Sequence, residues 1–319
     1  MDICILPLIT TVIQLIIGTV WEMFFKSYES DFYITMLQIF LTTFLSIGVP
    51  AYIYLLKTKK RIFPDIASDV KPNSLLIQAF ILGVSGQFAG ILVNLPVNAI
   101  YLTFKPEIPQ NHPDITNLKQ LAVGIIAMCV TPAFFEEIFF RGIIFNHFRR
   151  FGSSAATVLS AFLFATVHYS ALNFAGPFVL GLIFGIITAR THRIIYAIIA
   201  HFAVNLVALL LTYSTNFPIF ESYANAVMIA AIFISVPIVI HVVNKFRELA
   251  EPLPYSEIHP IEETEESTFQ TETGDTVKII QHQPREKMIY LAFQHIFSKP
   301  CIYIILAFFI FTAFAEFMF

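Results

Sequence analysis

Nine apolar runs dominate this chain, and most of them are long enough to cross a membrane. A hydrocarbon core about 30 Å thick is spanned by about 20 apolar residues in an α-helix. The runs lie at 3–25, 32–56, 75–104, 121–146, 154–174, 176–189, 194–214, 224–244 and 301–319. Backbone polar groups inside a bilayer must be satisfied within the protein, so such runs fold as helices. The sequence therefore predicts an all-α, polytopic membrane protein, with about eight core helices and one extra C-terminal helix.

The composition supports this class and excludes others. Hydrophobic residues make up 57% of the chain, charged residues only 13%, and the mean hydropathy is +0.74. These values lie far outside the range of soluble domains. The net charge of -3 gives no indication of a nucleic-acid partner. The run 176–189 is short and contains Gly176, Gly181 and Gly185, which predicts a helix that packs closely against its neighbours.

Lysine and arginine predict the orientation of the helices. They gather at alternate turns, namely at Lys57, Lys59, Lys60, Arg61, Arg149, Arg150, Arg190, Arg193, Lys245 and Arg247. The intervening turns carry only Lys26, Lys105 and Lys119. By the positive-inside rule, the basic turns and the N-terminus face the cytoplasm. The first run begins with an acidic residue and not with the positive charge of a signal peptide, so we expect it to be retained. We expect an integral, multi-pass protein of a prokaryotic plasma membrane.

We divide the chain into three parts. Residues 1–245 form the polytopic membrane core. Residues 246–288 are acidic and poor in core-forming residues, so we expect a largely disordered cytoplasmic segment. Within it, two strand-like pieces around Gly274 predict a hairpin. Residues 289–319 form an interfacial stretch and a C-terminal transmembrane helix, and the region 246–319 is a candidate surface for a protein partner.

Three polar signatures interrupt the runs between 121 and 214. They are Glu136-Glu137 with Arg141, Phe164 with His168, and His201 with Asn205. Ionisable side chains cost several kcal/mol in hydrocarbon unless they pair or line a wet cavity, so such a cluster is a candidate functional site. Counted along each helix from its cytoplasmic turn, the first glutamate and the two histidines lie roughly 20, 22 and 12 Å deep.

The spacing within each signature separates their roles. Residues four apart share a helix face, so Glu137 and Arg141 are expected to form a salt bridge. Glu136 lies about 100° further round the helix and is left without a partner on its own helix. His201 and Asn205 share a face by the same rule. Pro132 is expected to kink the helix close to the glutamates.

These residue types suit the hydrolysis of a peptide bond. A carboxylate held away from bulk water can accept a proton from a water molecule, and a histidine can orient that water. A second histidine and an asparagine supply donors for the negative oxygen of a tetrahedral intermediate, worth about 3–4 kcal/mol per good donor. The signatures of serine hydrolases, of zincins and of P-loop proteins are absent from the sequence.

The ordered set of signatures, over about residues 120–210, resembles the CPBP family of CAAX proteases and bacteriocin-processing enzymes. The resemblance implies an intramembrane endopeptidase similar to the type II CAAX prenyl proteases. In this mechanism Glu136 and His168 activate water, while His201 and Asn205 stabilise the oxyanion. Supporting roles would fall to three further residues, Glu137, Arg141 and Phe164. The implied substrate is a peptide or protein in the bilayer, lipidated or not.

Alternatives to this mechanism stay open. The glutamate mechanism needs no cofactor, but the family has also been regarded as metalloproteases, and zinc would then be bound by Glu136, His168 and His201. A catalytically idle member would act as a scaffold, an immunity protein or a regulator. A transporter also holds ionisable residues in the membrane, yet it usually has internal repeats, and none is found in the sequence.

Overall fold

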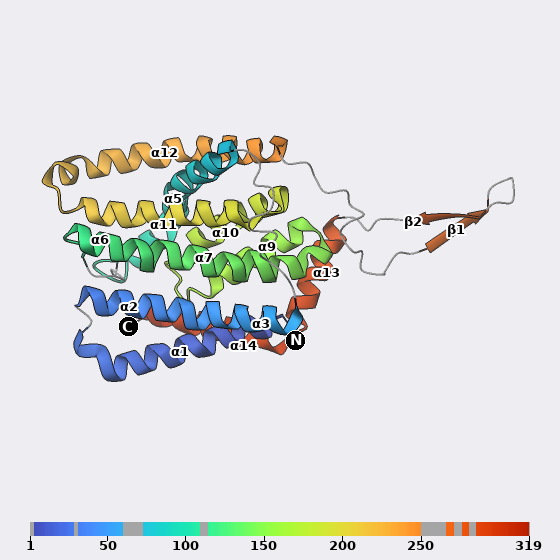
Figure 1. Cartoon of the computed structure of the whole chain (residues 1–319), viewed down its shortest axis with the longest axis horizontal. Coiled ribbons are helices and arrows are strands. Elements are labelled where there is room, and N and C mark those ends of the chain that lie inside the picture. The colour runs from blue at the N-terminus through green and yellow to red at the C-terminus, as the bar shows by residue number, and fades with distance from the viewer. Residues whose placement is uncertain are drawn as a thin grey trace.

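The protein is a bundle of membrane helices that lie side by side in several layers (Figure 1). The structure is a computed structural model, and it describes residues 3–28, 31–59, 73–108, 114–249, 266–270, 276–280 and 285–318. Its longer helices are α1 (Ile5–Phe25), α2 (Phe32–Thr43), α3 (Val49–Thr58), α5 (Asn73–Tyr101), α9 (Ser153–Thr166), α10 (Ala175–Thr191), α11 (Ile194–Ser214), α12 (Pro218–Leu249), α13 (Arg285–Phe297) and α14 (Pro300–Met318).

One continuous helix of six segments carries the first signature. These segments are α6 (Leu118–Gly124), η3 (Ile125–Val130), α7 (Thr131–Glu137), η4 (Ile138–Phe145), α8 (Asn146–Phe148) and η5 (Arg149–Phe151). Two shorter pieces complete the first two spans, η1 (Lys26–Tyr28) after α1, and η2 (Phe44–Gly48) between α2 and α3. The fold class predicted from the sequence, an all-α polytopic membrane protein, is confirmed.

Seven helices among the described residues are long and apolar enough to cross a membrane. They are Ile5–Tyr28, Phe32–Thr58, Leu75–Tyr101, Leu118–Phe151, Ile194–Ser214, Ala226–Phe246 and Pro300–Met318. The two remaining predicted runs, 154–174 and 176–189, instead form the shorter helices α9 and α10. The helix of the first of these runs ends at Thr166, and a turn joins it to α10. His168 therefore lies just past the end of α9, whereas the sequence predicted it within the helix.

The predicted hairpin is present. Strands β1 (Glu266–Gln270) and β2 (Thr276–Ile280) pair antiparallel, with Thr268 opposite Lys278. Figure 1 draws this hairpin apart from the helices. The structure does not describe residues 250–265, 271–275 and 281–284. The disorder predicted for this segment therefore stays a prediction.

Two prolines widen the helices just before them. Proline lacks the N–H of a regular helix and its ring clashes with the carbonyl one turn earlier. Directly before Pro50 and Pro132, the N–H groups of Val49 and Thr131 bond carbonyls five residues back, those of Phe44 and Ile126. Such π-helical turns are often found at functional sites. The distortion expected near Pro132 thus takes the form of a π-helical turn, one turn before the glutamates.

Glycines allow the central helices to approach closely. A Cβ atom added at Gly181 would lie 2.9 Å from the Cα of Ala161, and one at Gly185 would lie 2.9 Å from Cγ2 of Thr157. Both contacts join α10 to α9. This confirms the close packing predicted for the glycine-rich run. At Gly83 on α5, an added Cβ would overlap the carbonyl oxygen of Ala200 on α11.

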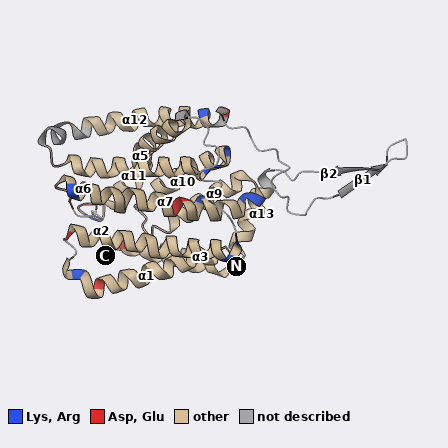
Figure 2. Ribbon diagram, in the orientation of Figure 1, with Lys and Arg blue, Asp and Glu red and all other residues tan. Residues whose placement is uncertain are grey.

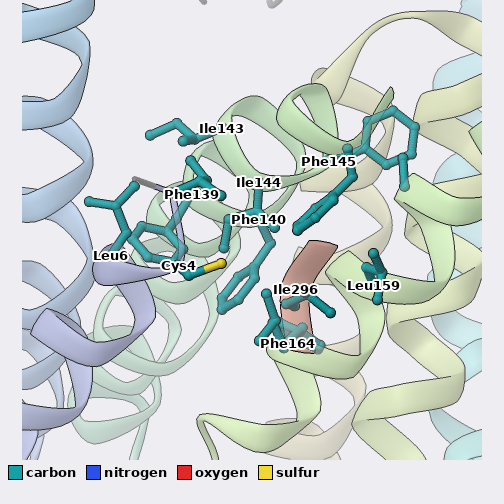
Figure 3. Close-up of a cluster of buried hydrophobic side chains, with 14 of the residues drawn as sticks. Cys4, Leu6, Phe139, Phe140, Ile143, Ile144, Phe145, Leu159, Phe164 and Ile296 are labelled. Carbon is teal, nitrogen blue, oxygen red and sulfur yellow. The ribbon is translucent and has the colours of Figure 1, made fainter. Parts of the chain in front are cut away.

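The largest hydrophobic cluster joins the C-terminal helices to the core. Figure 3 shows side chains of α1, η4, α9 and α13 meeting around Phe140 and Phe164. Ala292 and Ile296 of α13 and Ile302 of α14 are buried in the same cluster. The C-terminal helix is therefore packed against the helices that carry the signatures, and is not a separate appendage.

Charged residues lie mostly at the helix ends. Figure 2 shows lysines and arginines grouped mainly at the end of the bundle where the N-terminus lies. The acidic residues in the middle of the bundle, on α7, are Glu136 and Glu137. The protein is an integral, multi-pass membrane protein with two carboxylates held between its helices.

We predict that Gly83→Ala lowers the stability of the protein. The new methyl group meets the backbone of α11, and overpacking of this kind costs about 1–3 kcal/mol. The unfolding temperature of the purified protein in detergent measures the effect. Gly18→Ala is the matched control, because nothing lies within 4 Å of its added Cβ. Equal unfolding temperatures for the two variants would contradict the packing described for α5 and α11.

Candidate active site

A fully buried salt bridge forms the centre of the site. Nη1 of Arg141 lies 2.8 Å from Oε1 of Glu137, and both side chains have no exposed area. The pairing predicted from their spacing is confirmed. Nη2 of Arg141 also donates to the carbonyl oxygen of Gly181 at 3.1 Å. The salt bridge thus ties the helix of the glutamates to α10.

Aromatic rings cover the guanidinium group. Its central carbon lies 4.8 Å from the ring centre of Phe164 and 5.2 Å from that of Phe184. A cation over an aromatic face is attracted by the negative charge of that face, and the attraction grows when water is excluded. The rings therefore stabilise the charge of Arg141 in a place that water does not reach.

His201 joins the two glutamates. Its Nδ1 lies 2.9 Å from Oε1 of Glu137, and its Nε2 lies 3.9 Å from Oε2 of Glu136. A carboxylate oxygen only accepts hydrogen bonds, so Nδ1 carries a proton and donates to Glu137. The ring stacks on Phe184, with 5.3 Å between centres and 20° between planes. Glu137 thus accepts from both Arg141 and His201, and the orientation of the His201 ring is set by a carboxylate and an aromatic ring.

Glu136 differs from its neighbour in exposure. The side chain of Glu136 has a relative exposure of 15%, whereas the side chain of Glu137 has a relative exposure of 0%. Among the described residues, the only ion pair of Glu136 is the long contact with His201. Glu136 is therefore the accessible carboxylate of the two. It is also the one for which the sequence spacing gave no partner on its own helix.

His168 is held by the backbone at the end of α9. Its Nδ1 lies 2.8 Å from the carbonyl oxygen of Phe164, which only accepts, so Nδ1 carries the proton and Nε2 is left as an acceptor. The ring is exposed and meets the edge of Phe164 at 5.1 Å. Phe164 in turn meets His201 at 5.8 Å. Phe164 therefore lies between the two histidines, and among the described side chains no ion pair joins His168 to Glu136.

Asn205 follows His201 by one turn of α11 and is half-buried. No hydrogen bond of its side chain is found in the described part of the chain. The structure thus brings five predicted residues into contact, namely Glu136, Glu137, Arg141, Phe164 and His201. His168 reaches this group through Phe164, and Asn205 is associated with it through its position on α11.

The zinc alternative finds no ligand set in the described residues. No three His, Cys, Asp or Glu side chains among them lie close enough to hold one metal ion. The set named for zinc, Glu136, His168 and His201, is included in that search. We therefore derive no catalytic step through a metal ion.

The contacts of two residues in the site were not predicted from the sequence. Phe184 stacks on His201 and covers Arg141, and the carbonyl of Gly181 accepts from Arg141. Both residues belong to α10. The sequence showed Gly181 only as a small packing residue, and no pattern marked Phe184 among the many phenylalanines.

His192 lies in the turn between α10 and α11, outside the spans. Burial, and then the neighbouring charge of Arg149, lower the pKa of His192 to about 4. The imidazole is therefore neutral at physiological pH. His192 is not a charged group at the basic end of the bundle.

A polytopic helical membrane protein with a buried carboxylate, arginine and histidine cluster is the class that this fold and site define. Residues 118–207 match the family model described as type II CAAX prenyl endopeptidase Rce1-like. The matched segment runs from α6 into α11 and contains every predicted site residue. The resemblance to CAAX proteases is thereby confirmed for this segment. A search of curated proteins and a search of solved structures gave no match.

We predict that Arg141→Met strongly destabilises the protein. The change leaves the carboxylate of Glu137 buried without its cation, and breaking a buried pair in this way costs about 3–5 kcal/mol. The unfolding temperature in detergent is the measurement.

Glu22→Gln is the matched control for this prediction. Glu22 forms the same type of pair, four residues apart, with Lys26, but both side chains are more than half exposed. Exposed pairs contribute about 0–1 kcal/mol. A similar loss of stability in both variants would show that burial of Arg141 has no special cost.

Proposed function

We propose that the protein is an intramembrane endopeptidase that uses a glutamate to activate water. The match of residues 118–207 to a family of CAAX endopeptidases supports a peptidase activity. The observation that carries the glutamate mechanism is the contrast between the two adjacent carboxylates. Glu137 is fully buried and accepts from Arg141 and His201, whereas Glu136 is partly accessible beside the same histidine.

Glu136 acts as the general base in this mechanism. It accepts a proton from a water molecule, whose oxygen attacks the carbonyl carbon of the peptide bond. When the tetrahedral intermediate collapses and the C–N bond breaks, the same carboxyl group returns the proton to the leaving amine. Glu137 is unsuited to this role because its side chain is fully buried and its Oε1 already accepts hydrogen bonds from two donors.

His168 orients the attacking water. Its Nδ1 proton is directed to the carbonyl of Phe164, so Nε2 is available to accept a hydrogen bond from the water. Because Phe164 contacts both histidines, we propose that the water and the scissile bond lie beside its ring, within reach of Glu136, His168 and His201. Phe164 acts as a support that sets this spacing.

His201 and Asn205 stabilise the oxyanion. The Nδ1 proton of His201 is directed to Glu137, so Nε2 is the nitrogen that faces the substrate. Donation from Nε2 requires a second ring proton, and we propose that the imidazolium form binds the oxyanion. Asn205 donates from its side-chain amide one helical turn away. Glu137 and Arg141 act through His201, because they determine its orientation.

The N-terminus and the basic turns face the cytoplasm in our proposal. The described lysines and arginines lie mostly at the end of the bundle where the N-terminus lies (Figure 2), which supports this orientation. Lys60 and Arg61, which also entered the prediction, lie outside the described residues. The substrate class is a peptide or protein in the bilayer, lipidated or not, and the membrane is the plasma membrane of a prokaryote.

We predict that Glu136→Gln and His168→Ala each abolish most of the activity. Loss of the general base, Glu136, lowers the rate about 10²–10⁴-fold. Loss of His168 leaves the attacking water without the group that orients it. The measurement is hydrolysis of a fluorogenic CAAX-type peptide, offered with and without a prenyl group, by the purified protein in lipid nanodiscs.

Glu22→Gln serves again as the control and should retain wild-type rates. Activity of the wild type should also persist after chelation, with no stoichiometric metal found by elemental analysis. If Glu136→Gln and His168→Ala cleave as fast as the wild type, the proposed mechanism is wrong. If activity is lost on chelation and returns with zinc, the metal-dependent alternative replaces it.

We predict that Asn205→Ala lowers kcat about 10²–10³-fold with little change in KM. A donor to the oxyanion acts in the transition state and not in the bound substrate, so its loss appears in kcat. Steady-state kinetics on the same peptide give both constants. Asn98→Ala, on α5, is the control and should leave both unchanged. A rise in KM at constant kcat would instead assign Asn205 to substrate binding.

A further inference from the structure

The last helix reaches the loop that follows His168. Glu316, near the end of α14, accepts hydrogen bonds from Oγ of Ser170 at 2.7 Å, from N of Ala171 at 2.8 Å and from N of Leu172 at 3.4 Å. Asn173 in turn donates its N–H to Oγ of Ser170 at 3.1 Å. One carboxylate thus organises four consecutive residues of the loop.

This loop has few other ways to satisfy its backbone. The chain leaves helical geometry after Thr166, and its N–H groups then lie within the depth of the bilayer, where an unsatisfied polar group costs several kcal/mol. Along α14, Glu316 lies about 24 Å from Pro300, and the end of α9 lies about 20 Å from Ser153, at 1.5 Å per residue. The two sites therefore lie at similar distances from the start of their helices.

Other contacts press the same loop against α14 and α1. The ring of Tyr169 meets that of Phe308 at 5.0 Å, and its hydroxyl contacts Oγ1 of Thr11. The ring of Phe174, at the far end of the loop, meets Phe309 at 5.3 Å. Tyr169 also has a positive φ of 50°, a conformation that a bulky residue adopts only when its surroundings enforce it.

The position of His168 depends on this arrangement. Its N–H bonds the carbonyl of Ala165 at 3.3 Å, and the N–H of Tyr169 bonds that of Thr166 at 3.2 Å. These two bonds form the single turn that directs the imidazole towards Phe164. The residues on the C-terminal side of that turn are those held by α14.

We propose that Glu316 is a positioning residue for His168, and that α14 is thereby a part of the catalytic apparatus. This proposal rests on the proposed function, in which His168 orients the water. Glu316 does not touch the substrate. It holds the loop so that Nε2 of His168 stays at a fixed distance from Glu136.

The test compares Glu316→Gln with the wild type by two independent measurements. Glutamine has the shape of glutamate, but it is neutral and presents an NH₂ group in place of one acceptor oxygen. One acceptor contact is therefore lost, and the remaining hydrogen bonds to the amide oxygen are weaker than those to a carboxylate. Hydrogen exchange at residue resolution should become faster at Ala171 and Leu172 and also at His168 and Tyr169. On the fluorogenic peptide, kcat should fall about 10- to 100-fold, the range expected for a small misplacement of a reacting group, with KM within about twofold.

Phe314→Leu is the matched control on the same helix. Its side chain is exposed on α14, so exchange and kcat should equal those of the wild type. In Glu316→Gln, exchange could become faster at Ala171 and Leu172 but stay at the wild-type rate at His168 and Tyr169, with an unchanged kcat. This result would overturn the proposal and leave Glu316 as a cap of the loop only.

Two further results keep the test decisive. If Glu316→Gln fails to fold, Ser170→Ala removes one of the three donors, and it should show the same changes on a smaller scale. In Ser170→Ala, exchange could become faster at Ala171 and Leu172 while exchange at His168 and kcat stay at the wild-type values. This result would overturn the proposal. If the wild type cleaves no peptide, the proposed function fails, while exchange at His168 still decides whether Glu316 positions it.

Discussion

The cost of placing charge in a bilayer governs this structure. Arg141 and Glu137 are fully buried, and each is tolerable only because the other is present. Further hydrogen bonds of the pair go to Gly181 of α10 and His201 of α11, while Oε2 of Glu137 and Nε of Arg141 find no partner among the described residues. Three helices are thereby joined at one point. Their glycine contacts and the rings of Phe164 and Phe184 exclude water around that point.

The same constraint divides two adjacent glutamates. Glu137 accepts from a cation and a ring N–H, while Glu136 keeps some exposure and, within the described part of the chain, has one long ion-pair contact, with His201. Neither difference follows from the chemistry of the side chain, since the two are identical. It follows from their angular separation on the helix, which turns one carboxylate into the helix interface and leaves the other at its margin.

The sequence predicted what lies within one helix better than what lies between helices. The Glu137–Arg141 pair followed from spacing. The sequence also predicted a distortion at Pro132, but as a kink and not as the π-helical turn that the structure shows. The contact of His201 with Glu137 joins residues 64 positions apart, and no local pattern encodes it. The end of α9 at Thr166 was missed because the apolar run continues past it. Glu316 was not predicted as a functional residue, because its partners are the hydroxyl of Ser170 and two backbone N–H groups that lie about 145 positions earlier in the chain.

The shortness of α9 has a consequence for the way the bundle fills the membrane. A helix of 14 residues is about 21 Å long, roughly 9 Å less than the hydrocarbon thickness. Most residues of α9 are buried between other helices, so this difference is met inside the protein and not by the lipid. The loop that follows Thr166 completes this part of the bundle, and a carboxylate of the last helix supplies acceptors for the backbone N–H groups of that loop.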